Sequence, residues 1–247
     1  MSHPLIIPVN GSGRAKPNSF MYFRMCVRAL VSYRHYADQL SKIEKRDPKY
    51  DSALAQVEET AVEPVIYAGM CLEATLYDLA ACLFGEEFIE QIEKLDPLGK
   101  FYVVAHFVDR KPPSKASVTY QTIQAVVTAR NQLIHYKSQS VIKSDIAKVI
   151  SRAEKQHQQL DQGITSSFRA LVLLSLYFDG NIFEELRIIP SFKKKEYWIN
   201  IVPQELHEDV KWCIQASREE RRRSKAQDRP SNPAFEWDCT KARSPSI

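Results

Sequence analysis

The spacing of apolar side chains predicts helices in the first part of the chain. Apolar residues recur at three- and four-residue steps over residues 19–46, the pattern of an amphipathic helix. Asp47-Pro48 is expected to cap and open a second helix, and Pro64 is expected to break or kink it. Residues 65–84 are the most apolar stretch and end at Gly85, so we expect them to form the central buried helix.

The same pattern predicts further helices up to residue 178. They are a short acidic helix over 86–94, a helix that Asp96-Pro97 opens and Pro112-Pro113 stops, a helix over 118–135 capped by Ser114 or Ser117, and a long helix over 145–178. The sequence therefore predicts an all-α protein, a helical bundle of four to five longer helices.

The two ends of the chain have a different character. Closely spaced prolines and glycines before Ser19 predict a flexible arm without regular structure. After Gly180 the β-prone strings RIIP and EYWINIV precede a helical pattern, which predicts a small mixed extension: a strand or extended piece and one more helix. The expected organisation is an arm over 1–18, the bundle over 19–180, the extension over 181–227 and a disordered tail over 228–247.

Composition favours a helical fold and argues against several others. The chain of 247 residues has only 7 glycines, whereas an average usage of about 7% would supply about 17. Few positions can therefore adopt positive φ without strain, which argues against a glycine-rich phosphate loop, a dinucleotide-binding turn or a many-turned β-sandwich. Hydrophobic residues make up 44% and charged residues 26%, close to ordinary globular values.

The cysteines and the N-terminus bear on cofactors and location. The five cysteines include no C-x-x-C pair, so we expect free thiols in a reducing compartment, no metal site and no other cofactor. The first residues lack a basic region followed by an apolar core, so no signal peptide is expected. No uninterrupted apolar run is long enough to predict a membrane-spanning helix. We therefore expect a cytoplasmic protein that does not bind membranes.

Basic residues are concentrated in the middle of the chain. The whole chain carries a net charge of +4, but residues 100–160 hold ten lysines or arginines against three acids, a net +7. Such a segment is expected either for a phosphate-contacting surface or for solvated helix faces. A second basic run, 218–223, is interleaved with Glu219 and Glu220, and we interpret it as the solvated end of a helix.

The basic middle segment also contains the best candidate for chemistry, Arg130 and His135 in the string ARNQLIHY. A histidine can transfer a proton near neutral pH and the planar arginine fork can bind phosphoryl oxygens, so the pair suits cleavage of a phosphodiester. The spacing alone is weak evidence, because an arginine followed by a histidine after four to six residues also occurs by chance. It occurs three times here, at Arg28 and His35, at Arg130 and His135, and at Arg152 and His157.

The residues between Arg130 and His135 distinguish this pair from the other two. Asn131 follows the arginine and lies four residues before His135, on the same helical face. Leu133 and Ile134 are apolar, so the element is expected to be anchored in the core, as a preorganised site requires. On a regular helix Arg130 and His135 would lie about 140° apart, so their convergence on one substrate requires a helix end or a second subunit.

With Arg130, Asn131 and His135 the chain resembles the HEPN family, helical domains named for nucleotide-binding members in higher eukaryotes and prokaryotes. The upstream strings CLEATLYDLA and KLDPLGKFYVV are similar to the corresponding stretches of bacterial members, so the resemblance covers roughly residues 20–178. It implies a homodimeric, metal-independent endoribonuclease whose two motifs face one RNA-binding cleft. Many members of this family are toxins or antiphage effectors, so an antitoxin or regulatory protein is a further implied partner.

The resemblance also implies roles for the three motif residues. His135 is the expected general base toward the ribose 2′-hydroxyl, Arg130 stabilises charge on the phosphorane, and Asn131 orients the phosphate or His135. The leaving 5′-oxygen takes a proton from the symmetry-related histidine or from water, which gives a 2′,3′-cyclic phosphate and a 5′-hydroxyl. DNA lacks the 2′-hydroxyl and should resist cleavage.

Four more residues are expected to support the site. Tyr136 directly follows the motif, and Lys137 and Lys143 lie in the basic segment, where we expect them to contact RNA. Glu73 lies among apolar residues of the central helix, where an unpaired carboxylate should not stay buried. We expect it either to pair with Arg130 or to lie partly exposed at the edge of the bundle.

Two other functions stay open at this point. The basic segment is only mildly charged and the resemblance does not explain residues after 180, so a non-catalytic HEPN module that binds RNA, a nucleotide or a partner protein is the alternative. A helical scaffold without a nucleic-acid role is expected if Arg130 and His135 face the interior of one subunit.

Overall fold

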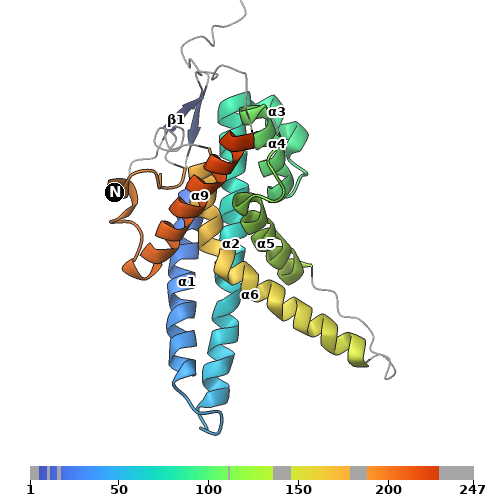
Figure 1. Ribbon diagram of the computed structural model, residues 1–247, viewed down its shortest axis with the longest axis vertical. Coiled ribbons are helices and arrows are strands. Elements are labelled where there is room, and N and C mark those ends of the chain that lie inside the picture. Colours follow the sequence, from blue (N-terminus) through green and yellow to red (C-terminus); the bar gives the residue numbers. More distant parts are fainter. Residues whose placement is uncertain are drawn as a thin grey trace, which may run out of the picture.

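The fold is a bundle of long helices, which confirms the predicted all-α class. The computed structural model describes residues 6–9, 12–15, 18–110, 112–135, 146–178 and 188–227. Figure 1 shows two long antiparallel helices along the long axis, α1 (Ser19–Ser41) and α2 (Tyr50–Phe84), with the other helices packed around their upper part. The bundle is completed by α3 (Glu86–Ile92), α4 (Pro97–Asp109), α5 (Val118–Ile134) and α6 (Ile146–Tyr177).

Local capping signals set several helix ends where the sequence predicts them. The Asp96 side chain accepts a hydrogen bond from the backbone N–H of Gly99 at 2.8 Å and caps α4. Of the two serines considered for α5, Ser117 is the cap, because its hydroxyl accepts from the backbone N–H of Tyr120 at 3.1 Å. α2 ends at Gly85, whose φ of 91° is a conformation that other residues rarely adopt.

Pro64, which was expected to break or kink the second helix, does not break it. α2 continues through Pro64 without interruption (Figure 1). A proline inside a helix removes a backbone hydrogen bond and costs about 3 kcal/mol, so tertiary packing must offset it. Pro64 and Val65 are buried, and the Cys26 thiol of α1 donates to the carbonyl oxygen of Pro64 at 3.6 Å.

α2 also starts later than Asp47-Pro48 predicts. The Asp47 carboxylate accepts a hydrogen bond from the backbone N–H of Lys49 at 2.8 Å, which closes a turn before the helix. The first helical residue is therefore Tyr50, and Lys49 occupies the cap position without a side-chain cap bond. Asp47 favours the turn because its short side chain competes for backbone donors.

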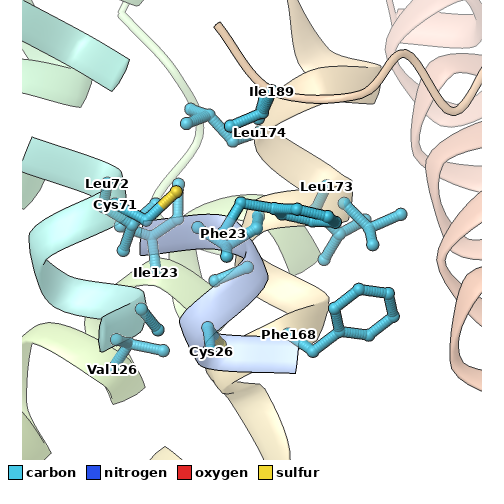
Figure 2. Close-up of a cluster of buried hydrophobic side chains, with 14 of the residues drawn as sticks. Phe23, Cys26, Cys71, Leu72, Ile123, Val126, Phe168, Leu173, Leu174 and Ile189 are labelled. Carbon is cyan, nitrogen blue, oxygen red and sulfur yellow. The ribbon is translucent and has the colours of Figure 1, made fainter. Parts of the chain in front are cut away.

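The core lies where α1, α2, α5 and α6 meet. Figure 2 shows Phe23 of α1 among Leu72 of α2, Ile123 of α5 and Phe168 of α6, and all four side chains are fully buried. Within the described residues, α2 is long and apolar enough to span a membrane by length and composition, but 61% of its most apolar stretch is buried inside the protein. Its central position in the bundle accounts for this composition.

The N-terminal residues form a hairpin where the sequence predicts a flexible arm. β1 (Ile6–Val9) pairs antiparallel with β2 (Ser12–Ala15) in a register that joins Val9 to Ser12. In the sequence, Asn10-Gly11 separates the strands, and Asn-Gly is strongly favoured in two-residue hairpin connections. The prediction of irregular structure is therefore wrong for these strands: it followed the prolines and missed the turn signal.

The C-terminal segment contributes one more long helix, as predicted. It contains α8 (Lys195–Trp198), the short 3₁₀ helix η2 (Gln204–Leu206) and α9 (His207–Gln227). The expectation was a strand or an extended piece: within residues 188–227 no strand is present, residues 188–194 form neither helix nor strand, and residues 196–198 of the β-prone string EYWINIV belong to α8. Strand propensity depends on a neighbouring strand to pair with, and these residues pack against helices.

A buried carboxylate joins α9 to the bundle. Asp209 is 5% exposed and lies 2.7 Å from a guanidinium nitrogen of Arg34 on α1 and 2.6 Å from Nε of Arg169 on α6. We call these three residues the Asp209 cluster. The guanidinium of Arg169 also lies 4.5 Å from the ring centre of Trp212. Close charge-assisted bonds of this kind fix α9 across the bundle (Figure 1).

The basic run on α9 is not simply a solvated helix end. Glu220 accepts from the Thr119 hydroxyl at 3.3 Å at the start of α5, and Arg221 donates to the carbonyl oxygen of Leu176 at the end of α6. An acid at a helix N-terminus and a base at a helix C-terminus both complement the helix dipole. Arg218, Arg221, Arg222 and Arg223 are all exposed, as the interpretation predicts, but Glu220 and Arg221 also join α9 to the ends of α5 and α6.

Candidate functional site

The Arg130 motif lies at the C-terminal end of α5, where that helix crosses α6. Ala129, directly before Arg130, is buried, and a Cβ atom placed on Gly163 of α6 would lie only 2.3 Å from the Cβ of Ala129. Only a glycine at 163 allows the two helices to approach this closely. The side chains of Gln132 and Gln159 are also hydrogen-bonded across the crossing. The motif is thus held on a rigid helix.

Arg130 extends from α5 across the surface of α2. A Cβ atom on Gly69 of α2 would lie 3.0 Å from Cγ of Arg130, so the missing side chain makes room for the arginine stem. Nη2 of Arg130 lies 3.7 Å from Oε2 of Glu73, and Nη1 donates to Oδ1 of Asn131 at 3.3 Å. The side chain is 22% exposed. Its Nε is buried and has no hydrogen-bond partner within the described residues.

Glu73 meets both of the expectations raised for it. Its side chain is 40% exposed at the edge of the bundle, and it also faces Arg130. Its closer partner is Lys100 of α4, whose Nζ lies 3.0 Å from Oε1 of Glu73. We call Arg130, Glu73 and Lys100 the Glu73 cluster. It joins α5, α2 and α4 and contains two cations and one carboxylate, a net charge of +1.

Lys100 is the member of the site that sequence reasoning missed. Its side chain is 2% exposed, and an ionised lysine is rarely so buried unless it is paired. A signal was present in the sequence, because Lys100 shares the apolar face of α4 with Pro97, Phe101 and Val104. Its partner could not be identified, since the crossing of α4 over α2 is a long-range contact.

His135 lies at the end of α5 and points to solvent. It is the residue after the last helical one, with φ −106° and ψ 24°, and its backbone N–H donates to the carbonyl oxygen of Asn131 at 2.9 Å. Convergence of Arg130 and His135 on one substrate was expected to require a helix end or a second subunit, and His135 does lie at a helix end. In the described part of the chain, however, no hydrogen bond or ion pair joins the His135 side chain to Arg130.

Ile134 does not anchor the motif, although its apolar character predicted that it would. Its side chain is 49% exposed, whereas Leu133 is partly buried against the core. The helix ends at this point, so Ile134 extends past the surface that α5 buries. Anchoring comes from Ala129 and Leu133 instead.

The other two arginine–histidine pairs are placed on exposed helix faces. Arg28 and His35 are both exposed on α1, and Arg152 and His157 are both exposed on α6. His157 is 77% exposed and pairs with Asp161 one turn later on the same helix, at 3.6 Å. Of the three pairs, only the one at 130 and 135 has its arginine packed against other helices.

Three predicted site residues, Tyr136, Lys137 and Lys143, lie outside the described residues. Within the described ranges, no three His, Cys, Asp or Glu side chains come together as metal ligands would. Four of the cysteines are free thiols, and burial raises the pKa of Cys26 to about 12. A raised pKa disfavours the reactive thiolate, so Cys26 is a core residue rather than a nucleophile.

The fold and the site together define an all-α protein with a net-positive charged cluster beside an exposed histidine. Comparison of the chain with protein-family models, with curated proteins and with solved structures finds no match. The Glu73 cluster and His135 are therefore the features from which a function can be inferred.

Proposed function

We propose that the protein is an endoribonuclease that cleaves RNA at the Arg130 motif through side-chain chemistry, without a metal ion. The observation that carries the proposal is the state of Arg130. Its stem is packed against Gly69 of α2, its Nε has no partner within the described residues, and its ion pair with Glu73 is long at 3.7 Å. An arginine that is fixed in place and incompletely paired suits the binding of a phosphodiester.

In this proposal Arg130 binds a nonbridging phosphoryl oxygen and stabilises the charge that develops on the phosphorane. His135 removes the proton from the ribose 2′-hydroxyl, whose oxygen attacks phosphorus as the bond to the 5′-oxygen breaks. The 5′-oxygen leaves with a proton supplied by a second His135 or by water. Asn131, which already bonds Nη1 of Arg130, orients the guanidinium or the phosphate.

We propose that the active form is a homodimer. His135 is exposed and has no hydrogen bond or ion pair to Arg130 within the described residues, so a second chain that brings its own motif across the interface would complete the site. Ile134 supports this arrangement, because a large apolar side chain that is 49% exposed beside the histidine favours burial by a partner. Lys137 and Lys143 of each chain would contact RNA near the motif.

A toxin or antiphage role in the cytoplasm, with an antitoxin or regulatory protein as a further partner and no membrane partner, belongs to the same proposal. The free thiols among the described cysteines suit a reducing compartment. The net charge of +1 in the Glu73 cluster suits an anionic substrate.

Purified protein incubated with total RNA in EDTA tests the proposal. Arg130→Ala and His135→Ala should each reduce cleavage by at least about 100-fold, the usual weight of a proton-transfer group or of a charge-stabilising donor. The products of the unmodified protein should end in a 2′,3′-cyclic phosphate, and DNA of the same sequence should stay intact.

The chain offers a matched control in Arg152 and His157. This pair has the same spacing of four intervening residues but lies on an exposed helix face. Arg152→Ala and His157→Ala should leave cleavage unchanged. Equal activity in the Arg130→Ala, His135→Ala and control variants, or no cleavage by the unmodified protein, would overturn the proposal.

One observation favours a second function, a non-catalytic module that binds RNA, a nucleotide or a partner protein. The His135 side chain contacts neither Arg130 nor Glu73 within the described residues, so one chain contains an anion site without a placed base. In that case Arg130→Ala should weaken binding and reduce its salt dependence, while no cleavage product forms.

A further inference from the structure

The reaction just proposed assigns no role to Lys100, although its side chain is almost fully buried within the site. Its side chain is 2% exposed, and within the described residues its ammonium group donates to Oε1 of Glu73 at 3.0 Å and to no other acceptor. Burying an ammonium group costs free energy that a single hydrogen-bonded carboxylate offsets only in part. A hydrophobic side chain of similar size would fill the same space without that cost, so the charge requires another explanation.

The position of Glu73 between two cations explains why a charged residue is kept at position 100. Its Oε1 is within hydrogen-bond distance of Lys100, whereas its Oε2 is 3.7 Å from Nη2 of Arg130, beyond that distance. The Glu73 side chain is 40% exposed and therefore has room to shift. Arginine and carboxylate groups favour a two-bond arrangement through parallel N–H groups, and Nε of Arg130, which has no partner within the described residues, would supply the second bond.

We propose that Lys100 is a positioning residue that holds Glu73 away from Arg130 and so keeps the Arg130 guanidinium available for an anionic ligand. Without Lys100, Glu73 moves to Arg130, forms a close two-bond ion pair and neutralises the group that binds phosphate. We call the bond by which Lys100 holds Glu73 the tether. Its importance for RNA binding rests on the proposed function. The tether itself is a property of the three side chains.

The movement of Glu73 toward Arg130 is detected by NMR of the Arg130 side chain. In protein labelled with ¹⁵N, the Nε–H signal of Arg130 is assigned by its disappearance in Arg130→Lys. Lys100→Met should shift this signal and slow rotation of the guanidinium, because a two-bond ion pair restrains it. Adding Glu73→Gln to Lys100→Met should reverse both changes. Lys100→Gln is a second variant that should act in the same direction if the methionine disturbs folding.

Binding of RNA is measured separately, with His135→Ala as the background so that no cleavage occurs. The probe is a fluorescent single-stranded RNA oligonucleotide. Lys100→Met should weaken its binding at least about tenfold, the weight of one charge-assisted hydrogen bond, and Glu73→Gln in the same chain should restore it. Lys45→Met is the matched control, because it removes an exposed lysine that lies outside the basic segment 100–160.

The two measurements separate failure of the tether from failure of the proposed function. An Arg130 signal that does not respond to Lys100→Met, or that Glu73→Gln does not reverse, overturns the tether whatever happens to RNA. A signal that responds as expected in a protein that neither binds nor cleaves RNA supports the tether and overturns the proposed function. A merely structural role for Lys100 predicts no rescue by Glu73→Gln, which removes one more charge from the cluster.

Discussion

The Glu73 cluster and the Asp209 cluster each contain one carboxylate and two cationic side chains, but they differ in how closely these charges are paired. In each, one carboxylate lies between two cationic side chains that come from other helices. Asp209 is 5% exposed and lies 2.7 and 2.6 Å from its two arginines. Glu73 is 40% exposed and lies 3.0 Å from Lys100 but 3.7 Å from Arg130.

This difference separates a structural contact from a candidate binding site. Both arginines of the Asp209 cluster bond the carboxylate directly, Arg34 through Nη2 and Arg169 through Nε. Arg130 keeps hydrogen-bonding capacity, because its Nε has no partner within the described residues and the Glu73 carboxylate, 3.7 Å from Nη2, is too distant for a hydrogen bond. The distance and exposure of the shared carboxylate, rather than the number of charges, distinguish the two clusters.

The largest effect on stability is expected at Asp209. Asp209→Asn keeps the shape of the side chain but leaves Arg34 and Arg169 without a counterion, and both guanidinium groups are partly buried. We expect the free energy of unfolding to fall by about 2–4 kcal/mol, the cost of breaking a buried ion pair after partial rehydration. Urea unfolding at neutral pH measures this loss.

Asp38 provides the control for this prediction. It lies 2.5 Å from Lys42, at least as close as the Asp209 contacts, but it is 60% exposed. Asp38→Asn should therefore change the free energy of unfolding by less than about 1 kcal/mol. Equal losses for the two substitutions would contradict the importance given to burial in the comparison.

A smaller effect is expected where α5 crosses α6 beside the motif. The methyl group of Gly163→Ala would meet Ala129 at 2.3 Å and Val65 at 3.4 Å, so the helices must separate. We expect a loss of about 1–3 kcal/mol in the free energy of unfolding and a fall in any RNA cleavage, because Arg130 moves with α5. Thermal unfolding and cleavage assays test both.

The double substitution Gly163→Ala with Ala129→Gly moves the methyl group from one helix to the other. It should recover most of the stability and activity that Gly163→Ala loses, because the space between the helices is restored. A double variant that is no better than Gly163→Ala would show that close approach at this crossing is not what fixes the motif.

The smallest effect is expected at Tyr177, near the end of the bundle that α9 covers. Its hydroxyl donates to Asp109 at 2.6 Å, and burial, with Asp109 next, raises its pKa. Because the folded-state pKa lies above the unfolded value of about 10, the stabilisation is complete below about pH 10 and is lost as pH rises further. Tyr177→Phe should cost about 1 kcal/mol at neutral pH and reduce the alkaline loss. Urea unfolding between pH 8 and pH 11 compares the two proteins.

The helices could be predicted because their signals are local. Ser117, Asp96 and Gly85 each act within one turn of the chain, and the apolar periodicity needs no knowledge of the partner helix. The continuity of α2 through Pro64 could not be predicted in this way, because it depends on packing against α1 from a distant part of the sequence. Local preference was overridden by tertiary contact.

The candidate site also contains residues with a local sequence signal and residues whose role depends on long-range packing. Arg130, Asn131 and His135 stand out as a short string, and Glu73 stands out as a carboxylate in an apolar helix. Lys100 becomes part of the site only when α4 crosses α2, and the structural roles of Glu220 and Arg221 appear only when α9 reaches the ends of α5 and α6. The periodicity of apolar residues does not show which distant helices pack against one another.

The contacts between α1 and the C-terminal segment have a consequence for the order of folding. Arg34 bonds Asp209 across 175 positions of the chain, and Ser19 donates to the carbonyl oxygen of Ile188 across 169. During synthesis the first helix must therefore wait for α9 to leave the ribosome before its own contacts are complete. Contacts between distant segments slow folding. We expect the bundle to become fully stable only after α9 has been made, long after the Arg130 motif.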